Sequence, residues 1–196
     1  MPLEPTVKRV AAFIDGQNLY HQAKDAFGHH YPNYDFPALA EAVCDPLGWQ
    51  LTRTHFYTGV PDQNQDRFWN AFWTKKLAVM GTRGIQVFSR HLRHGKEKGI
   101  DVRIALDTVQ AARSNDCDVI LIFSQDQDLS EAADEIRQIS IDEDRWIKVA
   151  SAYPFTPTVS NQRGINGTEW IKIARSTYDH CIDPRDYRPS RSILTP

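Results

Sequence analysis

The run of apolar residues at 118–124, DVILIFS, constrains the fold of this chain more than any other segment. Its interior holds no polar residue, which is typical of a strand that is buried on both faces. Strands of that kind lie in parallel sheets, whose two faces are covered by helices. The sequence therefore predicts that residues 118–124 form a central strand of such a sheet.

Other segments of the chain alternate between the patterns of strands and helices. Four further strands are expected, at residues 9–14, 49–58, 85–90 and 146–152. Helices are expected at residues 18–27, from Asp35 onward, and at 66–80, 101–113, 129–139 and 168–175. Strands that alternate with helices at this spacing form parallel sheets, because each crossover returns to the same end of the sheet. The sequence therefore predicts an α/β fold with a central, mostly parallel sheet of five strands.

The composition fits one globular domain and excludes several classes of protein. With 24% charged and 11% aromatic residues, the 196-residue chain is too apolar to be disordered and long enough to form one hydrophobic core. It holds no run approaching the roughly 20 apolar residues of a membrane span, and no basic-then-apolar leader. We therefore expect a single cytoplasmic domain over residues 1–196, without membrane contact. Its core is expected at 9–152, and residues 153–196 are expected to add a short helix and an irregular tail.

The cysteines, histidines and net charge narrow the possible ligands. The three cysteines are an odd number at wide spacing without a C-x-x-C pair, which fits free thiols in a reducing compartment. None of the seven histidines is spaced with a second His or Cys as in a structural zinc site. The net charge of −2 confines any nucleic-acid contact to a local basic region.

Four aspartates fall where this fold would bring them together. Asp15 ends the first strand, and Asp101 begins the helix after the third. Asp126 and Asp128 follow the fourth strand, and Asn18 begins the helix after the first. In open α/β sheets ligands bind at the carboxyl ends of the strands, where all these residues should gather. A single Asp in such a place is usually a helix cap or a turn residue, but that explanation fails for four.

Carboxylates that lie this close raise one another's pKa unless a positive charge sits among them. A divalent cation is the simplest source of that charge. Because no His or Cys is near these residues in the sequence, Mg²⁺ or Mn²⁺ fits better than Zn²⁺, and such ions commonly meet a phosphate substrate. The site therefore indicates phosphodiester chemistry. Asp107 is a weaker candidate, because six positions along the helix rotate it to a different face from Asp101.

The four aspartates Asp15, Asp101, Asp126 and Asp128 lie in three segments: FIDGQNLY at 13–20, KGIDV at 98–102 and IFSQDQDL at 122–129. In content, order and spacing they resemble the signature segments of the NYN domain, the LabA-like branch of the PIN-like nuclease superfamily. The resemblance implies a PIN-like three-layer sandwich and a metal-dependent endoribonuclease that hydrolyses RNA. The catalytic and metal-binding residues that it implies are Asp15, Asp101, Asp126 and Asp128.

Two residues of the third segment depart from the family pattern. Gln125 stands where the family commonly has Gly, and Gln127 stands where it commonly has Ser. A bulky residue at 125 leaves an alternative open, a non-catalytic RNA-binding or regulatory module on the same fold. A phosphatase or a receiver domain fits less well, because the chain has no Lys at the end of its fifth strand and only one acid at the end of its first.

A basic segment at residues 89–98 directly precedes Asp101 and is expected to contact RNA phosphates, in single-stranded or structured RNA. Its cations are Arg90, Arg93, Lys96 and Lys98. Asn18 and Ser124 are further candidates for binding the substrate or a metal-bound water. The aromatic stripe at 68–73 is most simply core, although base stacking by one tryptophan stays open. A homodimer or a regulatory protein partner also stays open.

Overall fold

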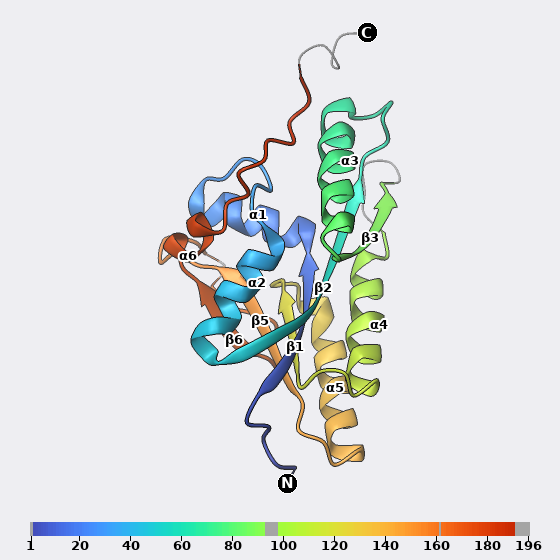
Figure 1. Ribbon diagram of the computed structural model, residues 1–196, viewed down its shortest axis with the longest axis vertical. Coiled ribbons are helices and arrows are strands. Elements are labelled where there is room, and N and C mark those ends of the chain that lie inside the picture. The colour runs from blue at the N-terminus through green and yellow to red at the C-terminus, as the bar shows by residue number, and fades with distance from the viewer. Residues whose placement is uncertain (1, 93–97, 161, 191–196) are drawn as a thin grey trace.

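The computed structural model describes residues 2–92, 98–160 and 162–190 (Figure 1). In these residues one sheet of six parallel strands lies at the centre, in the order β3-β2-β1-β4-β5-β6. The strands are β1 (Lys8–Asp15), β2 (Trp49–Val60), β3 (Gln86–His91), β4 (Val119–Phe123), β5 (Lys148–Pro154) and β6 (Glu169–Ile173). The predicted α/β fold with a parallel sheet is confirmed, but the number of strands is six and not five.

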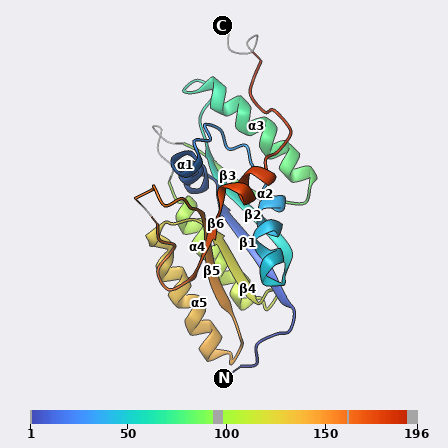
Figure 2. The same ribbon diagram turned by 90° about the vertical axis from the view of Figure 1, so that its left-hand side faces the viewer.

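Helices cover both faces of this sheet (Figure 2). The described helices are α1 (Gly16–Phe27), α2 (Phe36–Cys44), α3 (Arg67–Thr82), α4 (Ile100–Arg113), α5 (Ser130–Asp142) and α6 (Arg175–His180). Alternate residues of β1 enter two hydrophobic clusters, Ile14 one and Phe13 the other. The first cluster packs α1, α2 and α3 against one face of the sheet, and the second packs α4 and α5 against the opposite face. The three-layer arrangement agrees with the expected PIN-like sandwich.

Strand β4 is buried along its whole length and pairs with β1. The register runs from Val10 opposite Val119 to Ile14 opposite Phe123. This confirms that the apolar run at 118–124 forms a central strand, and its neighbour in the sheet is the first strand. Because the two strands run in the same direction and end together, the residues that follow them meet at one edge.

The sequence prediction of a helix at 168–175 was wrong. Residues Glu169–Ile173 form strand β6, which pairs in parallel with β5, and helix α6 begins only at Arg175. The segment EWIKI is rich in β-branched and aromatic residues, and its two isoleucines are the more buried ones, Ile171 half-buried and Ile173 buried. The edge of β5 offers backbone hydrogen bonds to a neighbouring strand, and residues 169–173 pair with it as β6.

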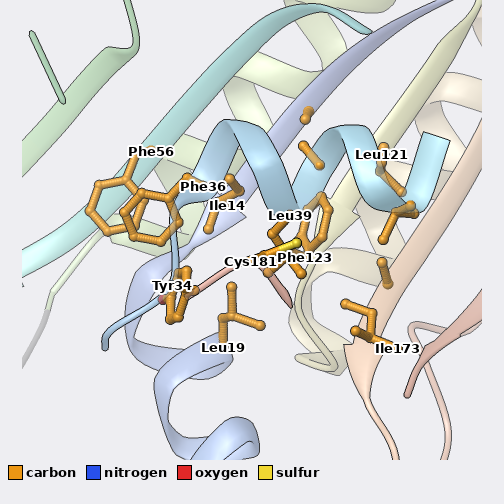
Figure 3. Close-up of a cluster of buried hydrophobic side chains, with 14 of the residues drawn as sticks. Ile14, Leu19, Tyr34, Phe36, Leu39, Phe56, Leu121, Phe123, Ile173 and Cys181 are labelled. Atoms are coloured by element: carbon orange, nitrogen blue, oxygen red, sulfur yellow. The ribbon is translucent and has the colours of Figure 1, made fainter. Parts of the chain in front are cut away.

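Residues after β5 also pack against the sheet and its helices. Figure 3 shows Cys181, which follows α6, among side chains of the core beside Leu39 and Phe123. Further along, the carboxylate of Asp183 lies 3.9 Å from the ammonium group of Lys76, which is 1% exposed. Lys76 Nζ donates a hydrogen bond to the carbonyl of Tyr34 at 3.0 Å, and burial lowers its pKa to about 8. The C-terminal segment therefore helps to enclose a charge that would otherwise face water.

Two further observations bear on the expectations from composition. Cys44, Cys117 and Cys181 are all buried and none forms a disulfide. Within the described residues, no helix combines the length and the apolar character needed to cross a membrane.

Candidate active site

Asp15 lies at the point where β1 ends and α1 begins, and only 4% of its surface is exposed. One carboxylate oxygen accepts a hydrogen bond from the backbone N–H of Asn18 at 3.0 Å and thereby caps α1. The helix can follow the strand at once because residue 16 is glycine. A Cβ atom at Gly16 would lie 2.5 Å from the ring of Phe56 and 2.8 Å from the carbonyl of Tyr57.

The environment of Asp15 raises its pKa to about 6, and burial is the main cause. The negative charges of Asp101 and Asp126 raise it further. Hydrogen bonds from the Asn18 backbone and from the Ser124 hydroxyl act in the opposite direction, because they stabilise the ionised form. Asp15 therefore carries a negative charge that the surrounding protein only partly compensates.

Ser124 joins the ends of β1 and β4. Its hydroxyl donates a hydrogen bond to the second oxygen of Asp15 at 3.2 Å and accepts one from the backbone N–H of Asp126 at 3.1 Å. The side-chain carbonyl of Asn18 accepts a hydrogen bond from the backbone N–H of Gln125 at 3.0 Å. Both residues are thus part of the frame that holds the acids, and Ser124 is 1% exposed.

The remaining acids approach Asp15 from the loop after β4 and from the start of α4. Asp126 is half-buried and accepts a hydrogen bond from the backbone N–H of Asp128, which is exposed, at 3.0 Å. Asp101 lies in the first turn of α4, directly after Gly99 and Ile100. Burial raises the pKa of Asp101, and the charges of Asp126 and Asp128 raise it further. The four predicted acids therefore lie at one edge of the sheet, near enough for their charges to influence one another's pKa.

The chemistry of this group of residues fits a hard divalent cation. Its donors are carboxylate, amide and hydroxyl oxygens, which Mg²⁺ and Mn²⁺ prefer, and a bound cation would lower the raised pKa of Asp15. Within the described residues, no set of three or more His, Cys, Asp or Glu side chains is close enough to hold an ion directly. Mg²⁺ usually keeps several waters and binds to proteins through one or two carboxylates.

The two glutamines that depart from the family pattern bind the segment at 162–166. Gln125 Nε2 donates a hydrogen bond to the carbonyl of Arg163 at 2.7 Å. The amide of Gln127 donates to the carbonyl of Gly164 at 3.1 Å and accepts from the backbone N–H of Asn166 at 3.1 Å. These contacts place Arg163, which is exposed, beside the loop that carries Asp126. This segment was not predicted from the sequence, although two large amides in place of small residues are a signal that such partners exist.

The structure describes two of the four predicted phosphate-binding cations, and it also describes Asp107. Arg90 and Lys98 are exposed, and Arg90 Nη1 donates to the carbonyl of Lys98 at 3.4 Å, which places both near the start of α4. Arg93 and Lys96 lie outside the described residues. Asp107 is engaged elsewhere, because its carboxylate accepts hydrogen bonds from the hydroxyl of Tyr57 at 2.8 Å and from Arg103 at 2.9 Å.

Comparisons with known proteins identify the family of this chain and a structure of similar fold. The family model of the NYN domain matches residues 9–157, which includes the four acids, β2 to β5 and all of β1 except its first residue. The crystal structure of a protein of unknown function from Vibrio parahaemolyticus is similar in fold, with a TM-score of 0.57 and 22% sequence identity. That similarity covers 85% of this chain and 93% of the other. A search of curated proteins found no match. The chain belongs to the NYN domain family, within the PIN-like nuclease superfamily.

Proposed function

We propose that this protein is a metal-dependent endoribonuclease that hydrolyses phosphodiester bonds of RNA. The observation that carries the proposal is the placement of four carboxylates near one another, at the ends of two adjacent strands and the start of α4, with Asp15 buried and its pKa raised to about 6. Like charges near one another disfavour the ionised form of each carboxyl group, and a bound cation relieves that repulsion. Membership of the NYN domain family adds support, because the family belongs to the PIN-like nucleases.

Each residue of the site has a distinct role in this proposal. The four aspartates would hold one or two Mg²⁺ or Mn²⁺ ions, and a bound ion of this kind lowers the pKa of water and polarises a phosphoryl oxygen. Ser124 and Asn18 keep the acids in place through the hydrogen bonds already described, and the NH₂ group of Asn18 can donate to a phosphate oxygen. Water supplies the new oxygen, the bond from phosphorus to the 3′ oxygen breaks, and the products carry a 5′-phosphate and a 3′-hydroxyl.

Incubation of the protein with labelled single-stranded RNA and matched DNA tests this function. Cleavage of RNA is expected with Mg²⁺ or Mn²⁺ and should stop when EDTA is in excess, because no side chain of the site can replace the charge of the ion. Undiminished cleavage in EDTA would contradict the metal dependence. Binding of RNA without cleavage in either metal would instead support the non-catalytic RNA-binding module.

Arg90 and Lys98 are proposed to bind RNA phosphates next to the acids. The change of either residue to Ala should weaken RNA binding and reduce the magnitude of the slope of log affinity against log salt by about 0.7 to 1. Each phosphate contact releases counterions when RNA binds, and the variant makes one contact fewer. Arg113→Ala is a matched control, because this exposed residue lies at the other end of α4, about 18 Å along the helix from Asp101. An unchanged slope in both variants would show that this segment does not bind phosphate.

A further inference from the structure

A pocket of about 450 Å³ lies between α1, α3 and the ends of two strands. Its volume is within the range of roughly 300–1,000 Å³ that is typical of small-molecule sites. The half-buried rings of Tyr20 and Trp69 and the exposed ring of His21 line it, and the buried Trp73 contributes to its wall. These four aromatic residues are distinct from the acids and the cations of the proposed active site.

This pocket opens at the same edge of the sheet as the acids. Gln17 lines it from the first turn of α1, two residues after Asp15. Pro61 and Leu92 line it directly after the ends of β2 and β3. In Figure 1 the arrowheads of β1, β2 and β3 point toward the part of the molecule that holds α1 and α3. A single strand of RNA that lies over the acids can therefore also extend to the pocket.

The chemistry of the lining favours a flat, uncharged group over a phosphate. Among the described residues that line the pocket, none is Lys or Arg, and Asp66 contributes a negative charge. The aromatic faces can stack on a planar ring. The amides of Gln17 and Gln65 can both donate and accept hydrogen bonds along the edge of such a ring. Nucleobases are recognised by this combination of stacking and edge contacts in single-stranded RNA.

The aromatic side chains of the pocket are already held in position. The ring of Trp69 contacts those of Tyr20, at 5.9 Å between centroids, and Phe72, at 5.2 Å. Its backbone N–H donates to Asp66, which caps α3, at 3.0 Å. The Tyr20 hydroxyl donates to the carbonyl of His30 at 3.0 Å, so that its ring rather than its hydroxyl is available to a ligand. A preformed stacking surface binds without the entropy cost of ordering side chains.

We propose that this pocket binds one nucleobase of a single-stranded RNA whose backbone lies over the carboxylates. The inference rests on the proposed nuclease function, because that function brings RNA to this edge of the sheet. The bound base fixes the position of the strand, so the pocket selects which phosphate lies at the acids and favours unpaired over paired RNA.

Binding measurements in EDTA test the pocket without relying on cleavage. The probes are a short labelled single-stranded RNA and a strand of equal length in which the riboses carry no bases. The wild-type protein should bind the RNA about tenfold more tightly than the abasic strand, because one stacked base contributes that much affinity. Trp69→Leu should lower the affinity for RNA about tenfold and leave the affinity for the abasic strand unchanged.

Two variants control for the loss of an aromatic residue as such. Trp69→Phe keeps a stacking face and should retain most of the affinity for RNA. Trp146→Leu removes a half-buried tryptophan that precedes β5, at the amino ends of the strands, and should bind like the wild type. If circular dichroism shows that Trp69→Leu does not fold, Tyr20→Leu replaces it as the test variant. The binding of RNA and of the abasic strand by the wild type then also tests whether the pocket binds a base.

The possible outcomes separate the pocket from the nuclease function. Equal binding of RNA and the abasic strand by the wild type would overturn the base pocket, even if the protein cleaves RNA. An equal loss of affinity for both strands in Trp69→Leu would also overturn it. Base-dependent binding without cleavage in Mn²⁺ would support the pocket and contradict the nuclease.

Discussion

Asp126→Asn should lower the rate of RNA cleavage at least 100-fold while the protein stays folded. The substitution removes one negative charge from the group of acids that is proposed to hold the metal ion. It preserves the local structure, because the side-chain oxygen of Asn can still accept the hydrogen bond that Asp128 N–H donates to Asp126. Loss of a strong electrostatic stabiliser of the transition state typically costs a factor of about 10² to 10³ in rate.

Single-turnover cleavage of labelled RNA at saturating Mn²⁺ measures this effect. Asp25→Asn provides the control, since it makes the same change of charge at an exposed position of α1. Circular dichroism should show the same spectrum for the wild type and both variants. Cleavage by Asp126→Asn at the wild-type rate would contradict the proposed role of the acids.

The position of the acids could be predicted because two simple rules were sufficient. The apolar run that forms β4 indicates a strand buried on both faces, and parallel strands end at a common edge. The residues after β1 and β4 therefore had to meet, whatever the details of packing. The hydrogen bonds from Ser124 to Asp15 at 3.2 Å and from the Gln125 backbone to Asn18 at 3.0 Å follow from that topology.

Other features could not be predicted because they depend on residues that are distant in the sequence. Strand β6 is short and lies at the edge of the sheet, and its pattern becomes meaningful only when β5 is available as a partner. The contact between Gln125 and Arg163 joins positions 38 residues apart. Lys76 is in a helix, where a lysine usually faces water, and it is buried because Asp183 and Tyr187 from the C-terminal segment cover it.

The nucleobase pocket shows the same difference between local and tertiary information. The aromatic stripe on α3 is visible in the sequence, and Phe72 and Trp73 are indeed buried in the core. Trp69 is only half-buried, and it lines a pocket because Tyr20 of α1 lies on its other side. Helical periodicity identifies such a stripe but not which of its members faces a neighbouring helix or a ligand.

Asp15→Asn should make the protein more stable at neutral pH in the absence of divalent metal. The pKa of Asp15 rises from 3.8, its ordinary value, to about 6 in the folded protein. The folded state therefore binds a proton more tightly than the unfolded state, and stability falls as the pH rises from about 4 to about 6. Above this window the ionised carboxylate costs about 3 kcal/mol, at about 1.4 kcal/mol per pKa unit. Asn avoids that cost and keeps the cap, since Asn and Asp are similarly good N-caps.

Thermal unfolding in EDTA measures the difference, which should reach roughly 6–12 °C in Tm at pH 7.5 and nearly vanish below pH 4. Asp118→Asn should have the opposite effect at neutral pH, because hydrogen bonds from Arg9 lower the pKa of Asp118 and its ionised form stabilises the fold. Saturating Mn²⁺ should then raise the Tm of the wild type more than that of Asp15→Asn, since an ion that binds only the folded state stabilises it. Equal stability of the wild type and Asp15→Asn at pH 7.5 would show that burial and the acidic neighbours of Asp15 do not destabilise its ionised form.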